Sequence, residues 1–369
     1  MPFKLMISST SELLSDPCKH CLESKDLSFK LLMSKLHSSS HHHQKVVAKV
    51  FDRHTKFLQR ERAALNPDAE LYDYLKEEVG YRLADRIFDI KRDLKIGLDL
   101  GCGRGHVAKN ISDATTLEHL YMGDMSPNML DTCATPENVP FTKKLVDEEE
   151  ALPFESKSMD LVISNLNLHW VNNLPGCLKE INRILKGDGV FLASMFGGDT
   201  LFELRSSLVL AELEREGGFA PHVSPFTEIR DIGGLLNQAG FSMLTIDSDE
   251  ISVGFPTMFE LMWDLQGMGE NNAGINRKLH LHRDTLFAAS AIYQEMYGQE
   301  EGIPATFQII YMIGWKPDAS QKVSIAERGS QQASLKDIHR LEEMIKEHGM
   351  EGKIKFMQEL TDEEKNKKD

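Results

Sequence analysis

The sequence has few cysteines, a deficit of positive charge and no long apolar run, and each of these absences excludes a class of protein. Its 5 cysteines, at positions 18, 21, 102, 133 and 177, are too few and too scattered for a disulfide framework, and they favour a reducing compartment. No apolar run approaches the roughly 18 residues that a transmembrane helix needs. Acidic residues number 57 against 42 Lys and Arg, a net charge of −15, which argues against broad electrostatic binding to nucleic acid or to an anionic membrane surface.

The two ends of the chain differ in composition from its middle. We expect residues 1–44, which are rich in Ser, Lys and His, to be an unfolded leader. The part from Leu27 to Ser40 has no acid, as in organellar presequences, but it also has no Arg and follows a segment with several acids. Either the leader is not a presequence, or translation starts further along, at Met33. Residues 317–369 predict a charged helical tail, which is either solvated or binds a partner through its apolar stripe.

Between these ends, helical and strand-like patterns alternate. Two amphipathic helices are predicted in an N-terminal region at 45–94, over 46–65 and 72–90. From 95 to 316 we expect one domain with short strands at 96–100, 120–123, 144–146, 159–164, 190–195, 243–246 and 307–313. Helices are predicted from residue 107, around 129, through 178–185 and over 229–239, with a turn at 187–189. Two further helices, over 258–268 and 277–297, form an insertion before the last strand. Such alternation is typical of an α/β fold with a mostly parallel sheet covered by helices.

A glycine-rich segment carries the strongest functional signal. Residues Leu98 to His106 read Leu-Asp-Leu-Gly-Cys-Gly-Arg-Gly-His, directly after a predicted strand and before a predicted helix. Glycines let the chain turn sharply and approach a ligand closely, and the start of the next helix offers free N–H groups. The spacing is G-x-G-x-G rather than the G-x-G-x-x-G of dinucleotide sites. Asp99, just before the glycines, would repel a pyrophosphate but would suit a cationic ligand such as the ammonium group of an amino acid.

Acidic residues follow the next two predicted strands. Asp124 ends the second strand 19 residues after Gly105, where doubly wound nucleotide-binding proteins position an acid for the ribose diol. The alternative for Asp124 is a helix cap, but Ser126 and the proline after it already supply that signal. Asp147, after the third strand, would lie near the same crevice and accept from an exocyclic adenine amine. We expect Glu148 and the two glutamates after it to be solvated.

Polar residues also follow the fourth predicted strand. Asn165 and His169 stand in the run Ser-Asn-Leu-Asn-Leu-His-Trp, and ligands of open sheets bind beyond the carboxyl ends of the strands. Both residues are therefore candidate catalytic residues that face a substrate. A packed Trp170 and a capping role for His169 explain the same pattern equally well.

Together these motifs resemble the class I S-adenosylmethionine-dependent methyltransferase fold. The resemblance covers about residues 95–195 and includes the run from Arg183 to Gly189. It implies a doubly wound sheet of seven strands whose last strand is antiparallel, and S-adenosylmethionine as the cofactor. The glycine loop and Asp99 would hold the methionine part, Asp124 would hold the ribose, and Asp147 would lie near the adenine. The full predicted cofactor-binding set is Asp99, Gly101, Cys102, Gly103, Gly105, Asp124, Met125 and Asp147.

A second resemblance covers about residues 46–316. Four segments are similar to the mitochondrial complex I assembly factors that act as arginine hydroxylases: Phe51–Arg53, Gln59–Ala64, Asn167–Pro175 and Phe196–Leu201. This family implies hydroxylation of an arginine on an iron–sulfur subunit of complex I, the NADH:ubiquinone oxidoreductase, together with other assembly factors. It also implies a location in the mitochondrial matrix, peripheral to the inner membrane. A more distant similarity is to the bacterial malonyl-carrier-protein methyltransferases.

Three functions remain open at this point, and none of them predicts an oligomeric state. The first is an arginine hydroxylase, the second a methyltransferase that acts on a small molecule or a carrier-protein thioester, and the third a non-catalytic assembly chaperone. No Asn-Pro-Pro-aromatic run is present, so methylation of nucleic-acid amino groups is disfavoured and no nucleic-acid partner is expected.

Hydroxylation needs activated oxygen, usually from a metal or a flavin. His282 and Asp284 have the His-x-acid spacing of an iron site, with His280 nearby, but positions two apart on a helix do not share a face. Cys18 and Cys21 are an isolated pair without the further ligands of a zinc site. We therefore expect no metal site.

Overall fold

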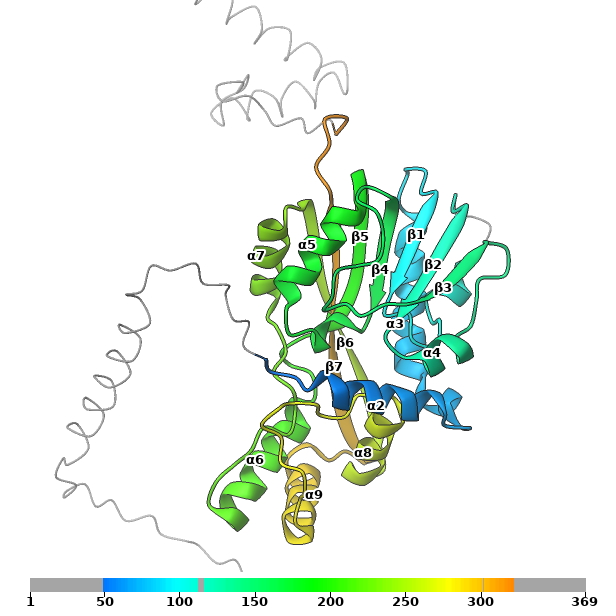
Figure 1. Ribbon diagram of the computed structural model, residues 1–369. Helices are drawn as coiled ribbons and strands as arrows, with labels where there is room; N and C mark the ends of the chain where they lie inside the picture. The colour runs from blue at the N-terminus through cyan, green and yellow to red at the C-terminus, as the bar shows by residue number, and fades with distance from the viewer. Residues whose placement is uncertain (1–48, 112–115, 301, 322–369) are drawn as a thin grey trace, which may run out of the picture. The chain divides into compact units, whose positions relative to one another are not determined.

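The computed structural model describes residues 49–111, 116–300 and 302–321, so the predicted leader and nearly all of the predicted tail lie outside the described residues. The strands are β1 (Ile96–Leu100), β2 (His119–Asp124), β3 (Phe141–Leu145), β4 (Met159–Asn165), β5 (Leu185–Phe196), β6 (Ser242–Phe255) and β7 (Ile303–Trp315). They form one sheet in the order β3-β2-β1-β4-β5-β7-β6 (Figure 1). Neighbouring strands are parallel except at β7, which is antiparallel to both β5 and β6. The predicted seven-stranded, mostly parallel sheet with a reversed last strand is confirmed.

Helices cover both faces of this sheet. They are α2 (Arg53–Ala64), α3 (Tyr74–Phe88), α4 (Pro127–Thr132), α5 (Leu174–Ile184), α6 (Phe202–Glu216), α7 (Ile229–Ala239), α8 (Met258–Gly267) and α9 (Arg283–Tyr297), with 3-10 turns η1 (Ala69–Tyr72), η2 (Ala108–Asn110) and η3 (Leu168–Trp170). α5 and α7 pack on one face and α3 on the other, whereas α6, α8 and α9 gather near α2, beyond the ends of the strands (Figure 1). Among the helices of the described ranges, none has the length and hydropathy to cross a bilayer.

The central strand β4 explains how the two layers join. All seven of its residues are buried, because helices lie over both of its faces. Leu161 and Ile163 belong to the core cluster that contains α3, and Val162 between them belongs to the cluster that contains α5 and α7. This alternation is the two-residue period of a strand, and burial on both faces is why the three consecutive residues at its centre are all apolar.

Three predicted helices differ from the structure by more than a turn. α2 begins at Arg53 rather than at residue 46, because the Asp52 side chain accepts from the Thr55 N–H (3.1 Å) and caps the helix. The helix predicted from residue 107 is only the turn η2 within the described residues, and the Asn110 side chain donates to the carbonyl of His106 (2.8 Å) there. α9 starts at Arg283 rather than at residue 277.

One prediction within β5 was wrong, and the helix that follows β5 was missed. The turn at 187–189 lies inside β5, as an irregularity where the pairing with β4 shifts register and Asp188 has a φ of 60°. The helix α6 was not predicted at all. Its buried face includes Glu203, Ser207 and Glu212 beside its leucines, so the apolar period is interrupted in the sequence.

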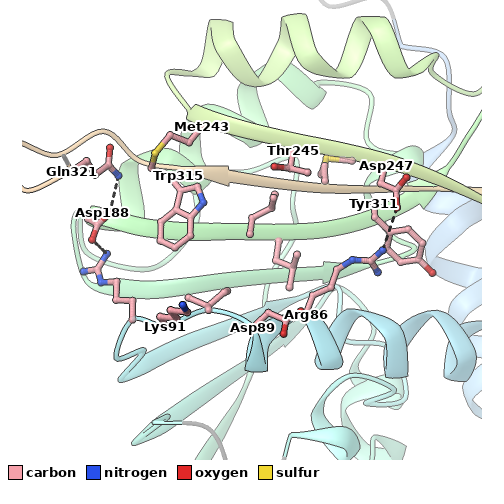
Figure 2. A pocket seen from close by; sticks show the side chains of 15 residues that line it. Arg86, Asp89, Lys91, Asp188, Met243, Thr245, Asp247, Tyr311, Trp315 and Gln321 are labelled. Atoms are coloured by element: carbon pink, nitrogen blue, oxygen red, sulfur yellow. Dashed lines mark hydrogen bonds and ion pairs between the residues drawn. The ribbon is translucent and has the colours of Figure 1, made fainter. Parts of the chain in front are cut away.

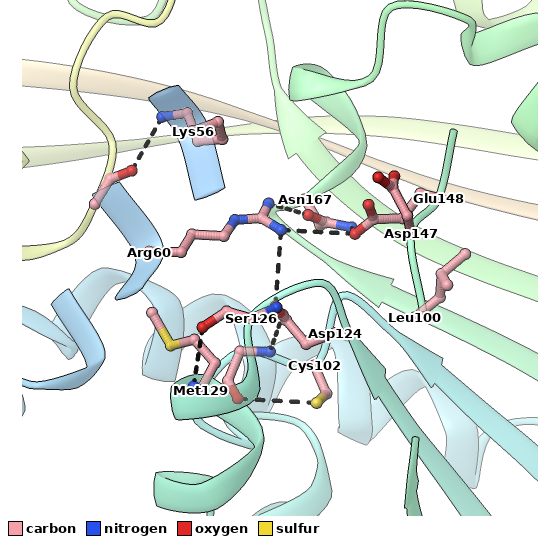
Figure 3. A network of polar contacts seen from close by, with 12 residues as sticks. Lys56, Arg60, Leu100, Cys102, Asp124, Ser126, Met129, Asp147, Glu148 and Asn167 are labelled. Carbon is pink, nitrogen blue, oxygen red and sulfur yellow. Dashed lines mark hydrogen bonds and ion pairs between the residues drawn. The ribbon is translucent and has the colours of Figure 1, made fainter. Parts of the chain in front are cut away.

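The arrangement of the sheet defines where a ligand can bind. β1 lies between β2 and β4, so the strand order reverses at β1 and the carboxyl ends of these strands meet at one edge. Open α/β sheets bind ligands in the crevice at such a point. α2 lies across this edge, and its side chains reach the loops that follow the strands (Figures 1 and 3).

Candidate functional site

The glycine loop after β1 turns back on the end of β2. The N–H groups of Gly101 and Cys102 both donate to the carbonyl of Gly123 (2.7 and 3.0 Å). Gly101 has a φ of 72°, and a Cβ there would collide with the side chain of Asn167. Gly103 has a φ of 52°, yet a Cβ there would meet no described atom within 4 Å. The loop therefore leaves open space over its middle glycine, where a ligand can approach the backbone.

Asp99 lies directly below this loop with no exposed surface. Neither of its carboxylate oxygens has a hydrogen-bond partner among the described residues. Burial, with smaller contributions from Cys133 and Asp124, raises the pKa of Asp99 to about 8. Buried polar groups are normally paired, so an unpartnered carboxylate next to an open loop is suited to a ligand with a cationic donor.

Asp124 ends β2 and holds the loop by hydrogen bonds. Its Oδ2 accepts from the N–H of Gly103 (3.0 Å), and its Oδ1 accepts from the N–H of Ser126 (2.9 Å). Burial raises the pKa of the Asp124 carboxyl, and the nearby guanidinium of Arg60 opposes that shift. Met125, which follows, is half-buried and lines the cavity described below.

The acids after β3 are not all solvated, so the expectation for Glu148 was wrong. Glu148 has no exposed side-chain surface, because Arg53 of α2 covers it. One guanidinium nitrogen of Arg53 donates to Glu148 Oε2 (2.6 Å) and to Asp147 Oδ1 (2.7 Å). Burial favours the neutral form of Glu148, but Arg60 and Arg53 outweigh it and lower the pKa of this carboxyl. The pair Arg53–Glu148 thus ties α2 to the end of β3.

Arg60 is a second arginine from α2 and enters the cleft itself (Figure 3). Its Nη2 donates to Oδ1 of Asn167. Its Nη1 lies 3.6 Å from Glu148 Oε1 and 4.0 Å from Asp124 Oδ1, and Asn167 Nδ2 donates to that same Glu148 oxygen (2.5 Å). Arg60 was not predicted as a site residue, although the segment Gln59–Ala64 that contains it was part of the family resemblance.

A cavity of about 440 Å³ opens between α2 and the ends of β2 and β3. Met125, Val146 and Asp147 line its sheet side, and His54 and Phe57 line its α2 side. The two α2 rings are stacked at 6.5 Å with an interplanar angle of 19°. A flat aromatic wall with a carboxylate at its edge suits an aromatic ring that carries an amine.

The two candidate catalytic residues after β4 have different surroundings. Both ends of the Asn165 amide are used, because Oδ1 accepts from Ser194 Oγ (2.9 Å) and Nδ2 donates to the carbonyl of Lys76 (3.0 Å). His169 Nε2 lies 3.3 Å from Glu270 Oε2, and its buried Nδ1 has no partner among the described residues. Burial lowers the pKa of His169, which keeps the ring neutral at pH 7. Asn165 is held as a structural amide, and His169 keeps a free ring nitrogen.

A second cavity, of about 340 Å³, lies next to His169. Trp170, Phe196 and Phe226 line it, and each of these rings lies 4.7–5.9 Å from the His169 ring. Its polar lining includes Glu270, which accepts from Trp170 Nε1 (2.7 Å) and pairs with Lys76 (2.9 Å), and Gln59, whose buried Oε1 has no described partner. Three cations, Arg62, Arg277 and Lys278, also line the cavity. Aromatic walls with buried acceptors suit a long side chain that has an apolar stem and a cationic head.

A larger cavity, of about 700 Å³, lies at the opposite edge of the sheet (Figure 2). Its lining comes from the end of α3 and the segment after it, and from β5, β6 and β7, and it includes Arg86, Asp188, Tyr311 and Trp315. This is the side of the sheet where the parallel strands begin, opposite to their carboxyl ends. It is therefore remote from the glycine loop and from the carboxylates after β2 and β3.

No group of three or more His, Cys, Asp or Glu that could hold a metal ion occurs within residues 49–111, 116–300 and 302–321. His282 occupies the N-cap position of α9 without a capping hydrogen bond from its side chain, and Asp284 lies in the first turn of the helix. The ring centroids of His280 and His282 are 5.7 Å apart.

The comparison with known families agrees with this geometry. A family model described as a methyltransferase domain matches residues 98–193, the part that runs from the glycine loop into β5. The strand order, the glycine loop after β1 and the acids after β2 and β3 define a class I S-adenosylmethionine-dependent methyltransferase fold.

Curated relatives extend the match beyond this domain. The chain is 53% identical over 293 residues to the mitochondrial arginine-hydroxylase NDUFAF5 of Danio rerio, which covers 79% of this chain and 90% of the relative. It is also 53% identical over 297 residues to the human protein of that name, covering 80% and 85%. The chain therefore belongs to the NDUFAF5 arginine-hydroxylase family. A malonyl-[acyl-carrier protein] O-methyltransferase from Methylovorus sp. (strain MP688) is 31% identical over 271 residues, covering 70% of this chain and 89% of that protein.

Proposed function

We propose that this protein is a mitochondrial arginine hydroxylase that binds S-adenosylmethionine at the carboxyl ends of β1 to β4. The observation that carries the cofactor assignment is the buried, unpartnered carboxylate of Asp99 under an open glycine loop. The hydroxylase activity is supported by the identity of about half of all residues over most of the chain with relatives of that name.

The residues of the cleft fit the cofactor. Asp99 and the loop of Gly101, Cys102, Gly103 and Gly105 would hold the cationic methionine part, and Asp124 would accept from the ribose hydroxyls. Met125 and Asp147 would border the adenine in the cavity of about 440 Å³, across from the His54 and Phe57 rings. When bound, S-adenosylmethionine supplies a sulfonium centre with an electrophilic methyl group.

The acceptor arginine would enter the cavity of about 340 Å³. Its methylene stem would contact Trp170 and Phe196, and its guanidinium would donate to Glu270 and to the free Oε1 of Gln59. His169 packs beside the Trp170, Phe196 and Phe226 rings of this cavity, and its neutral ring with one unpartnered nitrogen would be the nearby candidate catalytic group. Of the cations that line the cavity, Arg277 and Lys278 pair with acids of the chain, whereas Arg62 has no carboxylate partner among the described residues and would favour an acidic residue next to that arginine.

The cellular setting follows from the family. The relatives are named mitochondrial, and we propose that this protein acts in the matrix, peripheral to the inner membrane, on an iron–sulfur subunit of complex I and beside other assembly factors. Mass spectrometry of that subunit, from cells that lack the protein and from cells that express it again, tests the activity. We expect one arginine to lose one oxygen atom in the first cells and to regain it in the second. An arginine that keeps its extra oxygen without the protein would remove the proposal.

Methyl transfer to a carrier-protein thioester is the second candidate, favoured by the identity to the Methylovorus enzyme over 70% of the chain. Transfer of a labelled methyl group to a malonyl thioester by the purified protein would support it. A protein that binds the cofactor tightly but labels no thioester would argue against it. Asp124→Ala variants that bind no cofactor and still restore complex I assembly would instead support a non-catalytic chaperone.

A further inference from the structure

Arg60 has a spare hydrogen-bond donor inside the cleft. The residue is only 8% exposed, and its guanidinium extends from α2 to between the loops after β2, β3 and β4 (Figure 3). Nη2 donates to Asn167, but Nη1 has no hydrogen-bond partner among the described residues. The nearest carboxylate oxygens, of Glu148 and Asp124, lie 3.6 and 4.0 Å away. Because a buried donor without an acceptor costs free energy, this geometry points to an acceptor on a ligand.

Four other cations near the cleft have hydrogen-bond or ion-pair acceptors on the chain, namely Arg53, Lys56, Lys76 and Arg104. Arg53 pairs with the two acids after β3, and Lys56 donates to the backbone carbonyls of residues 269 and 271 (3.0 and 2.9 Å). Lys76 pairs with Glu270 and Arg104 pairs with Asp73, each at 2.9 Å. Arg53 also has two buried nitrogens without a hydrogen-bond partner, Nε and Nη1, but its guanidinium lies against the acids after β3. Arg60 instead lies 4.0 Å from Asp124, the residue that holds the glycine loop.

The charges of the cleft also indicate where an anionic group of a ligand can bind. Asp124, Asp147, Glu148 and Glu149 each have a carboxylate oxygen within 4.0 Å of Arg53 or Arg60, so four acids face two arginines. This excess of negative charge favours a ligand with a net positive charge. A negative group on such a ligand needs a cation between it and these carboxylates, and Arg60 provides that cation.

We propose that Arg60 Nη1 forms an anion subsite for the α-carboxylate of the ligand's amino-acid part. This inference rests on the proposed function for the identity of the ligand, an S-adenosylmethionine-type molecule. The guanidinium is suited to this task because it is permanently charged and donates in a fixed fork. Asn167 positions it: one amide group contacts both Arg60 and Glu148, so the guanidinium plane is fixed before the ligand arrives.

A pair of molecules that differ only in the carboxylate tests the subsite by titration calorimetry. S-adenosylmethionine and its decarboxylated form share the sulfonium, ribose and adenine. We expect the wild-type protein to bind the carboxylate-bearing molecule about 10- to 100-fold more tightly, the usual effect of a hydrogen bond between charged groups. Arg60→Ala should reduce this ratio to within about threefold, and Arg60→Lys should retain part of it.

Two further variants keep the test decisive. Arg60→Gln removes the charge but keeps an amide that can donate to Asn167, so it shows the lost preference even if the alanine variant does not fold. Arg230→Gln removes the same charge from a side chain that is 87% exposed on α7, and it should keep the wild-type ratio.

Each result is distinguishable from failure of the proposed function. A wild-type protein that binds both molecules equally, or an Arg60→Gln variant that keeps the preference, overturns the subsite and leaves the cofactor assignment intact. A wild-type protein that binds neither molecule overturns the cofactor assignment, and the subsite with it.

Discussion

The contact between Arg53 and Glu148 yields the most detailed prediction about stability. Glu148 has no exposed side-chain surface, and Arg53 donates to it at 2.6 Å while also holding Asp147 at 2.7 Å. Arg53→Ala would leave this buried carboxylate with Asn167 at 2.5 Å and Arg60 at 3.6 Å as its remaining partners. We expect the variant to be less stable than wild type.

The expected loss of stability in Arg53→Ala follows from the burial of Glu148 and from the partners that Glu148 keeps. Loss of one partner from a buried ion pair typically costs ~3–5 kcal/mol. Arg60 and Asn167 stay in contact with Glu148, and Asp147 is 35% exposed and can be solvated, so the cost should be lower. We expect the free energy of unfolding at pH 7 to fall by ~2–4 kcal/mol.

The effect should depend on pH. In the folded protein the pKa of Glu148 is lowered, so its stabilising contribution is present above its ordinary pKa and is lost as the pH falls through the folded value. Without Arg53, burial dominates and the pKa of Glu148 rises, because the charged form is no longer well compensated. The difference between variant and wild type should therefore be largest near pH 7 and shrink as the pH approaches about 4, where the variant carboxyl is protonated.

Urea unfolding followed by circular dichroism at pH 7 and pH 5 measures this difference. Arg230→Ala serves as the control, because Arg230 is 87% exposed and its loss should change stability by less than ~0.5 kcal/mol. Glu148→Gln added to Arg53→Ala should restore part of the loss, since the uncompensated charge is gone. A loss below about 0.5 kcal/mol, or one of equal size at both pH values, would refute the reasoning.

Three further predictions follow from the cleft. Asp99→Asn should raise the free energy of unfolding at pH 7 by ~2–4 kcal/mol and should weaken S-adenosylmethionine binding. The pKa of Asp99 is raised to about 8 in the folded protein, so above about pH 4 the unfolded chain ionises this carboxyl more readily and is favoured by it. Equal stabilities of the variant and wild type in parallel denaturation curves would contradict this. Gly101→Ala should abolish cofactor binding in calorimetry and lower stability, because a Cβ at φ 72° collides with Asn167, whereas Gly198→Ala, with open space around it, should leave cofactor binding unchanged. Trp170→Phe should lower stability by ~1–2 kcal/mol, because it removes the donor that holds Glu270 at 2.7 Å; a thermal melt like that of wild type would show that this bond contributes nothing.

Local patterns in the sequence predicted much of the fold. The strands β1, β2 and β4 were predicted within one residue at each end, and the bounds of α7 were predicted without error, because each is a short apolar or amphipathic run between turn signals. α6 was missed because polar residues interrupt its buried face, and the two glutamates among them are satisfied by groups elsewhere in the chain: Glu203 accepts from Thr306 across 103 positions, and Glu212 accepts from Lys278 across 66. No local pattern contains that information.

The sequence by itself determined where the glycine loop and the strand-terminal acids stand, because a tight turn requires glycine and a strand ends at a recognisable point. Only the tertiary structure decided which charges meet. Arg60 and Asn167 are 107 positions apart, and Arg53 and Glu148 are 95 apart, so their contacts arise when α2 closes over the strand ends. Burial then removes water from these groups. Glu148, expected at the surface, is therefore a buried partner of Arg53, and Arg60 has a buried donor that a ligand can use.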